Sequence, residues 1–183
     1  MRIALLGGTG DIGEGLALRW AHDTDHEIVI GSRDPEKARN KAEAYEAEID
    51  DRGVDTKITG FENGMAADRA EDGFHYHKPG AGSVTKIAVE AAPEGVPVVG
   101  AFHNLAAGRL TDLDAELGID TLLISDDEAA KSTVSSLAED IEGLRALDAG
   151  SVANAAEVES VTPLLINVAM NNSGLHDLGV RFD

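Results

Sequence analysis

A glycine-rich turn between a short apolar run and a helix-like segment constrains the fold of this 183-residue chain more than any other feature. The run at residues 2–6 is followed by the pattern G-x-G-x-x-G, made of Gly8, Thr9, Gly10, Asp11, Ile12 and Gly13. After a strand and before a helix, such glycines allow a tight turn, a close approach of the backbone to a pyrophosphate, and helix–strand packing. Free N–H groups at the helix start also favour an anion. The pattern predicts a dinucleotide site or, alternatively, a purely structural turn.

Strand-like and helix-like segments alternate through most of the chain, which predicts an α/β fold with a Rossmann-like, doubly wound parallel sheet. Ala38, Ala42, Tyr45 and Ile49 form one apolar stripe with helical spacing. The pattern breaks down near residues 63–81, where a doubly wound sheet adds its fourth strand. The expected strands span residues 2–6, 27–30, 57–61, 96–101, 121–124 and 144–148, and the expected helices begin near residues 15, 34, 84, 130 and 155.

Two regions are expected. Residues 1–150 form the Rossmann-like domain, and residues 151–183 form a small C-terminal helical extension. The stretch 155–170 is apolar on most sides, so we expect either the sheet or a second subunit to bury it. The second possibility predicts a homodimer.

The end of the second expected strand indicates which dinucleotide binds. NAD-dependent enzymes place an acid there to accept a hydrogen bond from the ribose 2′-hydroxyl. This chain has Ser32 and Arg33 instead, with Lys37 one helical turn later. A hydroxyl and two cations attract a 2′-phosphate, whereas an acid repels it. The sequence therefore predicts NADP held by Ser32, Arg33 and Lys37; the alternative is that the two cations are solvated charges at a helix start.

The charge balance excludes several classes of partner. There are 15 Lys and Arg against 34 Asp and Glu, for a formal net charge of −19, while 43% of residues are hydrophobic. This negative charge disfavours nucleic acid and membrane surfaces as partners. It predicts either the salt-adapted surface of a halophile or an ordinary acidic protein.

There is no Cys, which excludes disulfides and thiolate chemistry. No apolar run reaches the ~18 residues of a membrane helix, and a strand-like run stands where a leader would be, so we expect a cytoplasmic protein.

Few residues suggest side-chain catalysis. His103 follows an expected strand at its carboxyl edge, where it could donate a hydrogen bond or a proton near a reacting ring, or be structural. His75 and His77 have the spacing of one strand face, but without a third ligand we predict no metal site. Ser160 and Thr162 are expected to bond local backbone. A G-x-S-x-G motif and a Tyr followed four residues later by Lys are both missing, which disfavours serine hydrolases and Tyr/Lys reductases.

Several longer stretches carry a specific family resemblance. Residues 1–19, 26–33, 100–107, 141–150 and 157–167 closely resemble the archaeal, in particular haloarchaeal, NADPH-dependent reductases of the deazaflavin coenzyme F420. The resemblance implies direct hydride transfer between C5 of the deazaflavin and C4 of the nicotinamide, on a Rossmann domain with a C-terminal extension. It matches Thr9, Ser32, Arg33 and Lys37 to the family's NADP-binding positions. It also matches His103 and Leu105 to the pocket where the two rings meet.

One departure from the family stands out. Its members carry a strand, a helix and a further strand between the positions that match Asp72 and Gly73, which are adjacent here. Such a crossover needs roughly 30 residues. Either the printed sequence omits a real segment, or the chain is shortened and its first strand pairs with residues 96–101 or exposes an edge.

The leading hypothesis is an oxidoreductase that passes a hydride between NADP(H) and coenzyme F420. Two rings held face to face in a pocket closed to water need no side-chain nucleophile. Two alternatives are a non-catalytic or inactivated NADP-binding paralogue and an NADP-dependent reductase of another acceptor, such as an imine.

Overall fold

The computed structural model describes residues 1–6, 8–32, 34–53, 58–62, 76 and 78–183, which belong to two compact units. Unit 1 contains Met1–Asp68, Ala106–Leu117 and Asp140–Glu142. Unit 2 contains Arg69–Leu105, Gly118–Glu139 and Gly143–Asp183.

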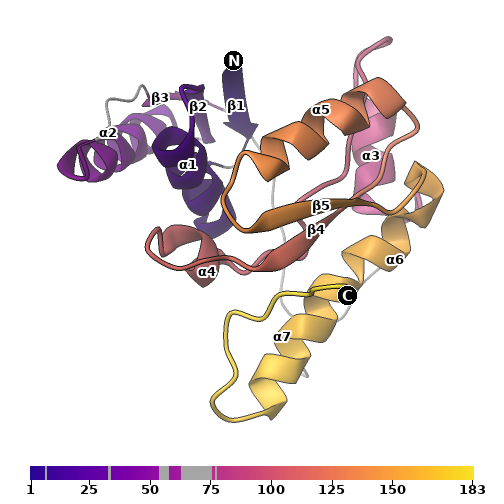
Figure 1. Cartoon of the computed structure of the whole chain (residues 1–183). Helices are drawn as coiled ribbons and strands as arrows, with labels where there is room; N and C mark the ends of the chain where they lie inside the picture. Colours follow the sequence, from indigo (N-terminus) through magenta and orange to yellow (C-terminus); the bar gives the residue numbers. More distant parts are fainter. Residues whose placement is uncertain (7, 33, 54–57, 63–75, 77) are drawn as a thin grey trace. The chain divides into compact units, whose positions relative to one another are not determined.

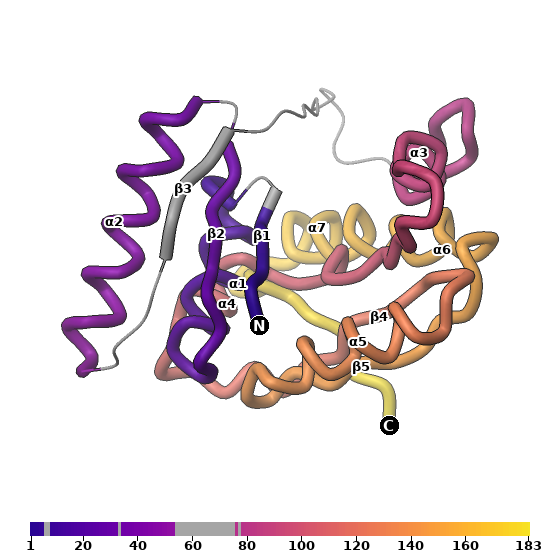
Figure 2. Tube along the Cα trace, turned by 90° about the horizontal axis from the view of Figure 1, so that it is seen from above, coloured from indigo at the N-terminus to yellow at the C-terminus, as the bar shows by residue number. Residues whose placement is uncertain are grey.

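Unit 1 is built on a parallel three-stranded sheet in the order β1-β2-β3 (Figure 2). Its strands alternate with helices along the chain, as in the mononucleotide-binding half of a Rossmann fold. The predicted stripe on the second helix is confirmed, because Ala38, Ala42, Tyr45 and Ile49 are all buried. The elements are β1 (Arg2–Leu6), α1 (Asp11–Asp23), β2 (Glu27–Ser32), α2 (Pro35–Asp51), β3 (Ile58–Glu62) and α4 (Ala107–Thr111).

A buried arginine fixes α4 to α1. Arg19 is only 3% exposed. Its guanidinium donates to the carbonyl oxygens of Leu110 (3.1 Å) and Ala115 (2.9 Å), and also to those of Arg109 and Asp112. These donors satisfy carbonyls at and beyond the end of α4, which a helix leaves unpaired. The two helices also approach closely at Gly15, where an added Cβ would lie 2.2 Å from Leu110 Cβ.

Unit 2 contains a parallel two-stranded sheet, with α5 packed against both strands (Figure 1). The buried Asp120 carboxylate accepts two hydrogen bonds from Arg145, both 2.8 Å, and one from the Phe182 N–H, 2.7 Å. The C-terminal residues are thereby held against the first strand of this sheet. The elements are α3 (Val84–Ala91), β4 (Ile119–Leu123), α5 (Glu128–Glu139), β5 (Leu144–Asp148), the short 3₁₀ helix η1 (Val152–Asn154), α6 (Ala155–Glu159) and α7 (Val161–Asn171).

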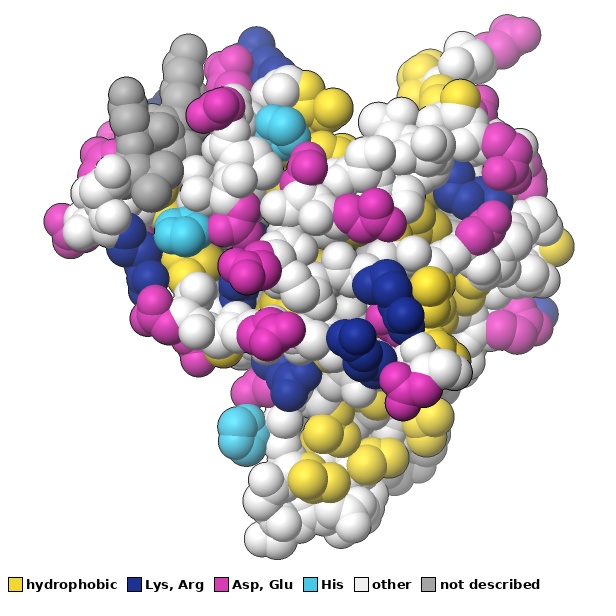
Figure 3. All heavy atoms as spheres, in the orientation of Figure 1, with side chains coloured by type: hydrophobic (Ala, Val, Ile, Leu, Met, Phe, Trp, Pro, Cys, Tyr) yellow, Lys and Arg dark blue, Asp and Glu magenta, His cyan; other side chains and the backbone are white. Residues whose placement is uncertain are grey.

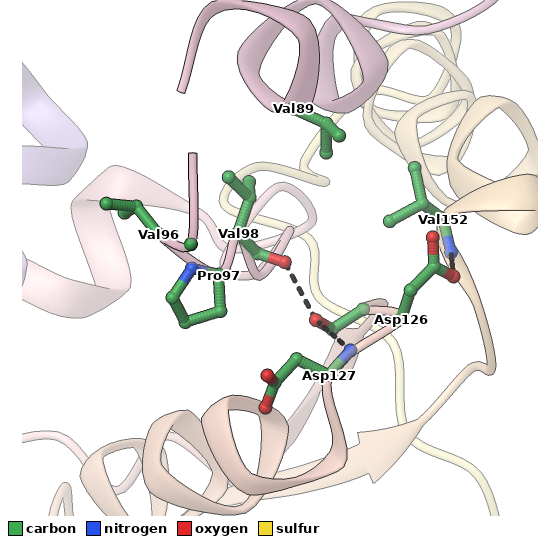
Figure 4. A pocket seen from close by; sticks show the side chains of 9 residues that line it. Val89, Val96, Pro97, Val98, Asp126, Asp127 and Val152 are labelled. Atoms are coloured by element: carbon green, nitrogen blue, oxygen red, sulfur yellow. Dashed lines mark hydrogen bonds between the residues drawn. The ribbon is translucent and has the colours of Figure 1, made fainter. Parts of the chain in front are cut away.

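The predicted α/β class with Rossmann-like parallel strands is confirmed, but the strand predicted at residues 96–101 is wrong. Only Gly100 pairs there, in one antiparallel bridge with Ile124. Two local features explain the difference. Pro97 has no N–H to donate, and the Val98 carbonyl accepts a hydrogen bond from the Ser125 hydroxyl at 2.8 Å (Figure 4). The described strands therefore form two sheets where one continuous sheet was predicted.

The C-terminal region is helical, as predicted, and the expected boundary at residue 150 stays a prediction. The expectation that the sheet buries residues 155–170 does not hold for α7, because Leu164 is 60% and Met170 57% exposed. Burial by a second subunit stays a prediction. Residues 63–75 and 77, most of the interrupted stretch, lie outside the described part of the chain. Among the described helices, none is both long and apolar enough to cross a membrane.

Candidate functional site

The glycine turn lies between β1 and α1 of unit 1, as predicted. The Gly8 N–H donates to the Leu5 carbonyl at 3.1 Å. An added Cβ on Gly8 would lie 3.0 Å from that same oxygen and 3.1 Å from Ile30 Cγ2, so the turn is too tight for a side chain. Gly10 is the N-cap of α1, and no described side chain caps the helix there. The N–H groups of the first turn, which contains Asp11, Ile12 and Gly13, are thus available to an anion.

Three polar side chains support this turn on the side of α2. The Tyr45 hydroxyl lies 3.3 Å from the Gly8 carbonyl oxygen and 3.0 Å from Glu14 Oε2, so it can donate to either. Lys41 Nζ is 2.8 Å from the same Glu14 oxygen and 5.2 Å from the centre of the Tyr45 ring. Burial first, and then the neighbouring Glu14, raise the pKa of Tyr45. The tyrosine is therefore a neutral donor at all physiological pH values.

Of the residues predicted to bind the 2′-phosphate, Ser32 lies at the carboxyl end of β2 and Lys37 lies in the first turn of α2. Gly31 pairs with Leu6, which places Ser32 beside the start of the glycine turn. Ser32 is only 7% exposed, and its hydroxyl accepts a hydrogen bond from the Asp34 N–H at 3.3 Å. Asp34 in turn caps α2 by accepting from the N–H groups of Glu36 and Lys37. The Lys37 side chain is exposed, and Arg33 lies outside the described residues.

Unit 2 contains a largely apolar cavity of about 340 Å³. His103 contributes to its wall, and the Nδ1 atom of this histidine is buried without a hydrogen-bond partner in the described part of the chain. Burial lowers the pKa of His103, and the charge of Glu159 opposes that shift only in part. The imidazole is therefore neutral at pH 7. The lining residues are Tyr76, Val84, His103, Glu159, Thr162, Pro163 and Ile166.

Glu159 organises the polar side of this cavity. Its carboxylate accepts hydrogen bonds from the Tyr76 hydroxyl (2.7 Å), the N–H groups of Val84 (2.9 Å) and Thr85 (2.8 Å), and the Thr85 hydroxyl (2.8 Å). Burial alone would raise the pKa of Glu159, but these four donors outweigh it and hold the pKa below its ordinary value. The carboxylate is thus ionised at neutral pH and fixes the start of α3 to the end of α6.

The backbone around His103 is held in an unusual conformation. Phe102 has a φ of 63°, in the left-handed region that a bulky residue seldom adopts. Its N–H donates to Thr121 Oγ1 at 3.0 Å, and the buried Asn104 donates to the Asp120 carbonyl at 2.6 Å. Strained backbone of this kind often belongs to functional sites. Leu105 follows in the same turn but is buried, and it is not one of the residues that line the cavity.

Ser160 and Thr162 behave differently from one another. The Ser160 hydroxyl donates to the nearby Glu157 carbonyl at 2.6 Å, as predicted. The expectation of a local partner is wrong for Thr162, because its hydroxyl donates to the carbonyl of His103, 59 residues away. This contact fixes α7 to the turn that carries the histidine.

A second cavity, of about 290 Å³, lies in unit 2 between α3, η1 and the chain after β4 (Figure 4). Its two carboxylates already accept backbone hydrogen bonds, Asp126 from the Val152 N–H and Asp127 from the Ala130 N–H. It contains no predicted site residue, and we assign it no role.

No metal-binding group of His, Asp and Glu occurs among the described residues, and His75 and His77 lie outside them.

Most of the residues that support these sites cannot be predicted from the sequence. Tyr45 was identified only as part of an apolar stripe, although Lys41 and Tyr45 have the four-residue spacing that places both on one helix face. Nothing in the sequence distinguished Glu159 or Tyr76, because their contact joins residues 83 positions apart.

The known proteins that are similar to this chain share one description. A family model described as "NADP oxidoreductase coenzyme F420-dependent" matches residues 2–79. A relative from Methanothermobacter marburgensis, named F420-dependent NADP reductase, is 35% identical over an alignment of 222 residues that covers 99% of this chain and 97% of the relative. A relative of the same name from Methanocaldococcus jannaschii is 33% identical, with 92% of each chain covered.

Among solved structures, this chain resembles a protein from Arthrobacter sp. FB24 assigned as an F420-dependent NADP-reductase. The TM-score is 0.69 at 19% identity, with 100% of this chain and 99% of that chain covered. At this identity the likeness supports the Rossmann-like fold alone.

Proposed function

Because this chain belongs to the family of coenzyme F420-dependent NADP oxidoreductases, we propose that it transfers a hydride between NADP(H) and coenzyme F420. The observation that carries the proposal is the likeness to its relatives along nearly the whole chain, at 35% identity over 99% of its length. Both candidate sites described above lie within that length.

The features of unit 1 fit NADP. The turn at Gly8 leaves no room for a Cβ, as expected where backbone must approach a pyrophosphate. We propose that Gly8–Gly13 bind the pyrophosphate and that Ser32, Arg33 and Lys37 bind the 2′-phosphate. The buried Ser32 hydroxyl already accepts one hydrogen bond, but it still has its own proton to donate to a phosphate oxygen.

The features of unit 2 fit a ring. The apolar cavity has a volume typical of small-molecule sites, and His103 contributes a polar side chain to its otherwise largely apolar wall. When bound, the nicotinamide and the deazaflavin supply the hydride chemistry themselves, between C4 of one ring and C5 of the other. His103 would then orient a ring through a hydrogen bond, while the apolar wall excludes water. Leu105 is buried outside the cavity, so it would contribute only by stabilising the turn that carries His103.

One assay tests the activity. Protein, NADPH and oxidised F420 are mixed, and the visible absorbance of the deazaflavin is followed. Loss of that absorbance, with NADPH consumed in equal amount, is the expected result. Binding of NADPH without loss of the absorbance would instead identify a non-catalytic paralogue. Oxidation of NADPH by an imine, with F420 left unchanged, would identify a reductase of another acceptor.

Cofactor preference is tested by matched charge reversals on α2. Lys37→Glu should weaken NADPH binding far more than NADH binding, because only NADPH carries the 2′-phosphate. Arg39→Glu makes the same charge change at an exposed position two residues further along α2 and should affect neither cofactor. Arg33→Asp should act like Lys37→Glu. Equal losses for NADPH and NADH would contradict the assignment.

We further propose a homodimer formed through α7. Hydrophobic side chains gather over this helix (Figure 3), where Leu164, Val168 and Met170 are exposed; Leu175, which follows the helix, is exposed as well. Light scattering should give twice the mass of one chain, and Leu164→Glu should halve that mass.

We also propose that the acidic surface is adapted to high salt, as in haloarchaea. The protein should then lose stability when salt is removed. The cytoplasmic location stays a prediction.

The internal segment is a separate question. The alignment with the M. marburgensis relative extends over 222 positions, so at least 39 of them have no counterpart among the 183 residues of this chain. We propose that these positions correspond to the strand, helix and strand expected after Asp72. If the printed sequence omits them, the intact mass of the native protein will exceed 19.1 kDa; a mass of 19.1 kDa would mean a truly shortened chain.

A further inference from the structure

We propose that Lys41 is a positioning residue of the dinucleotide site: it neutralises Glu14, so that the first turn of α1 can accept a pyrophosphate. The inference rests on the proposed function, because it concerns the same glycine turn. It adds Glu14, Lys41 and Tyr45, which belong neither to the glycine pattern nor to the residues proposed to bind the 2′-phosphate.

The first turn of α1 carries an electrostatic conflict. It contains two acidic side chains, Asp11 and Glu14. A carboxylate is favourable at a helix N-terminus for the same reason that an external anion is, namely the unpaired N–H groups and the positive end of the helix dipole. A pyrophosphate that uses this end must therefore approach a like charge. In a chain with a net charge of −19, no general excess of cations offsets that repulsion.

The structure compensates one of these charges. Glu14 Oε2 lies 2.8 Å from Lys41 Nζ and 3.0 Å from the Tyr45 hydroxyl, so the carboxylate is held against α2. Both partners project from one face of α2, one helical turn apart. The Glu14 and Lys41 side chains are 25% and 37% exposed, so solvent screens this pair only in part.

The same cluster touches the turn itself. The Tyr45 hydroxyl lies 3.3 Å from the Gly8 carbonyl oxygen, and Gly8 is the first glycine of the pattern. Glu14, Lys41 and Tyr45 therefore form one contact network behind the predicted pyrophosphate site. Because Lys41 and Glu14 have opposite charges, the pair presents no net charge there. Loss of Lys41 would leave the full charge of Glu14 beside the site.

A double-mutant cycle tests this coupling. The dissociation constant of NADPH is measured at one fixed salt concentration for the wild type, Lys41→Met, Glu14→Gln and the double variant. We expect Lys41→Met to raise the constant about two- to fivefold, the effect of one nearby charge at a helix terminus. In the Glu14→Gln background the same substitution should have no effect. Lys41→Arg should restore wild-type binding, and Arg39→Met, which removes an exposed cation of the same helix, should change nothing.

The outcomes separate this inference from the proposed function. If the wild type binds no NADPH, the proposed function fails. If the wild type binds NADPH and Lys41→Met binds it equally well, only the role of Lys41 is refuted. An equal loss on removing Lys41 with and without Glu14 would also refute it, since a purely structural effect does not depend on the carboxylate. Thermal melts of all variants confirm that each is folded.

Discussion

The tight turn at Gly8 gives a prediction that joins stability to binding. In Gly8→Ala the new methyl group would lie 3.0 Å from the Leu5 carbonyl oxygen and 3.1 Å from both Leu5 Cβ and Ile30 Cγ2. Ordinary contacts of this kind are several tenths of an ångström longer. Ile30 is fully buried in the sheet, and the Leu5 carbonyl belongs to the backbone of β1, so neither can move aside cheaply. The turn must shift instead.

Overpacking of this kind costs about 1–3 kcal/mol. For a chain of this size, each kcal/mol lowers the melting temperature by about 2–4 °C, so we expect a loss of about 2–12 °C. The shift should also disturb the contact of the Gly8 carbonyl with Tyr45. If binding NADPH requires the wild-type turn to be restored at about 1.4 kcal/mol, the dissociation constant rises about tenfold.

Two measurements check this prediction, a thermal melt and an NADPH titration. Gly80→Ala is the matched control, because an added Cβ there meets nothing within 4 Å. It should melt and bind like the wild type. A Gly8→Ala variant that also melts and binds like the wild type would refute the claim that this turn admits only glycine.

Two further predictions concern one buried residue in each unit, Arg19 in unit 1 and Glu159 in unit 2. Arg19→Leu leaves carbonyl oxygens at and beyond the end of α4 without their buried donor. A buried acceptor left unpaired costs about 1–3 kcal/mol, so we expect a loss of at least that size in denaturant unfolding, and an unchanged midpoint would contradict the role of Arg19. The pKa of Glu159 is lower in the folded than in the unfolded state, so the folded state binds fewer protons. The ionised carboxylate therefore stabilises the fold above the unfolded-state pKa, and this contribution is lost as the pH falls through the folded-state pKa. The stability difference between wild type and Glu159→Gln should therefore be constant near neutrality and vanish in acid; a difference that persists in acid would mean that ionisation of Glu159 is not its source.

The sequence predicted the regular parts of the fold because their causes are local. The glycine pattern and the buried stripe on α2 each depend on residues within a few positions of one another. Residues 96–101 show the limit of this approach. Their apolar composition is typical of a strand, yet a strand also needs partners, and here Ser125 takes up the carbonyl of Val98.

The predicted residues of the candidate site were those that a motif or a family resemblance makes visible. His103 was predicted from the family resemblance and from its place after residues 96–101, which are not a strand in the structure. The structure adds what holds this residue in place: Asn104 binds β4, and Thr162 binds the His103 carbonyl from α7. These contacts join positions 16 and 59 residues apart. No spacing rule predicts such pairs, because they depend on how distant elements pack.

The lowered pKa of His103 bears on how the proposed reaction would proceed. A hydride moves with both of its electrons from one ring carbon to another, so no side chain has to donate a proton at the reacting atoms. A histidine protonated at neutral pH would place a positive charge beside a nicotinamide ring that becomes cationic on oxidation, and the like charges would oppose that direction. Burial keeps the His103 imidazole neutral, and the side chain contributes to the wall of the cavity in unit 2. A neutral, fixed histidine thus suits positioning of a ring better than proton transfer, and the role of His103 itself stays a prediction.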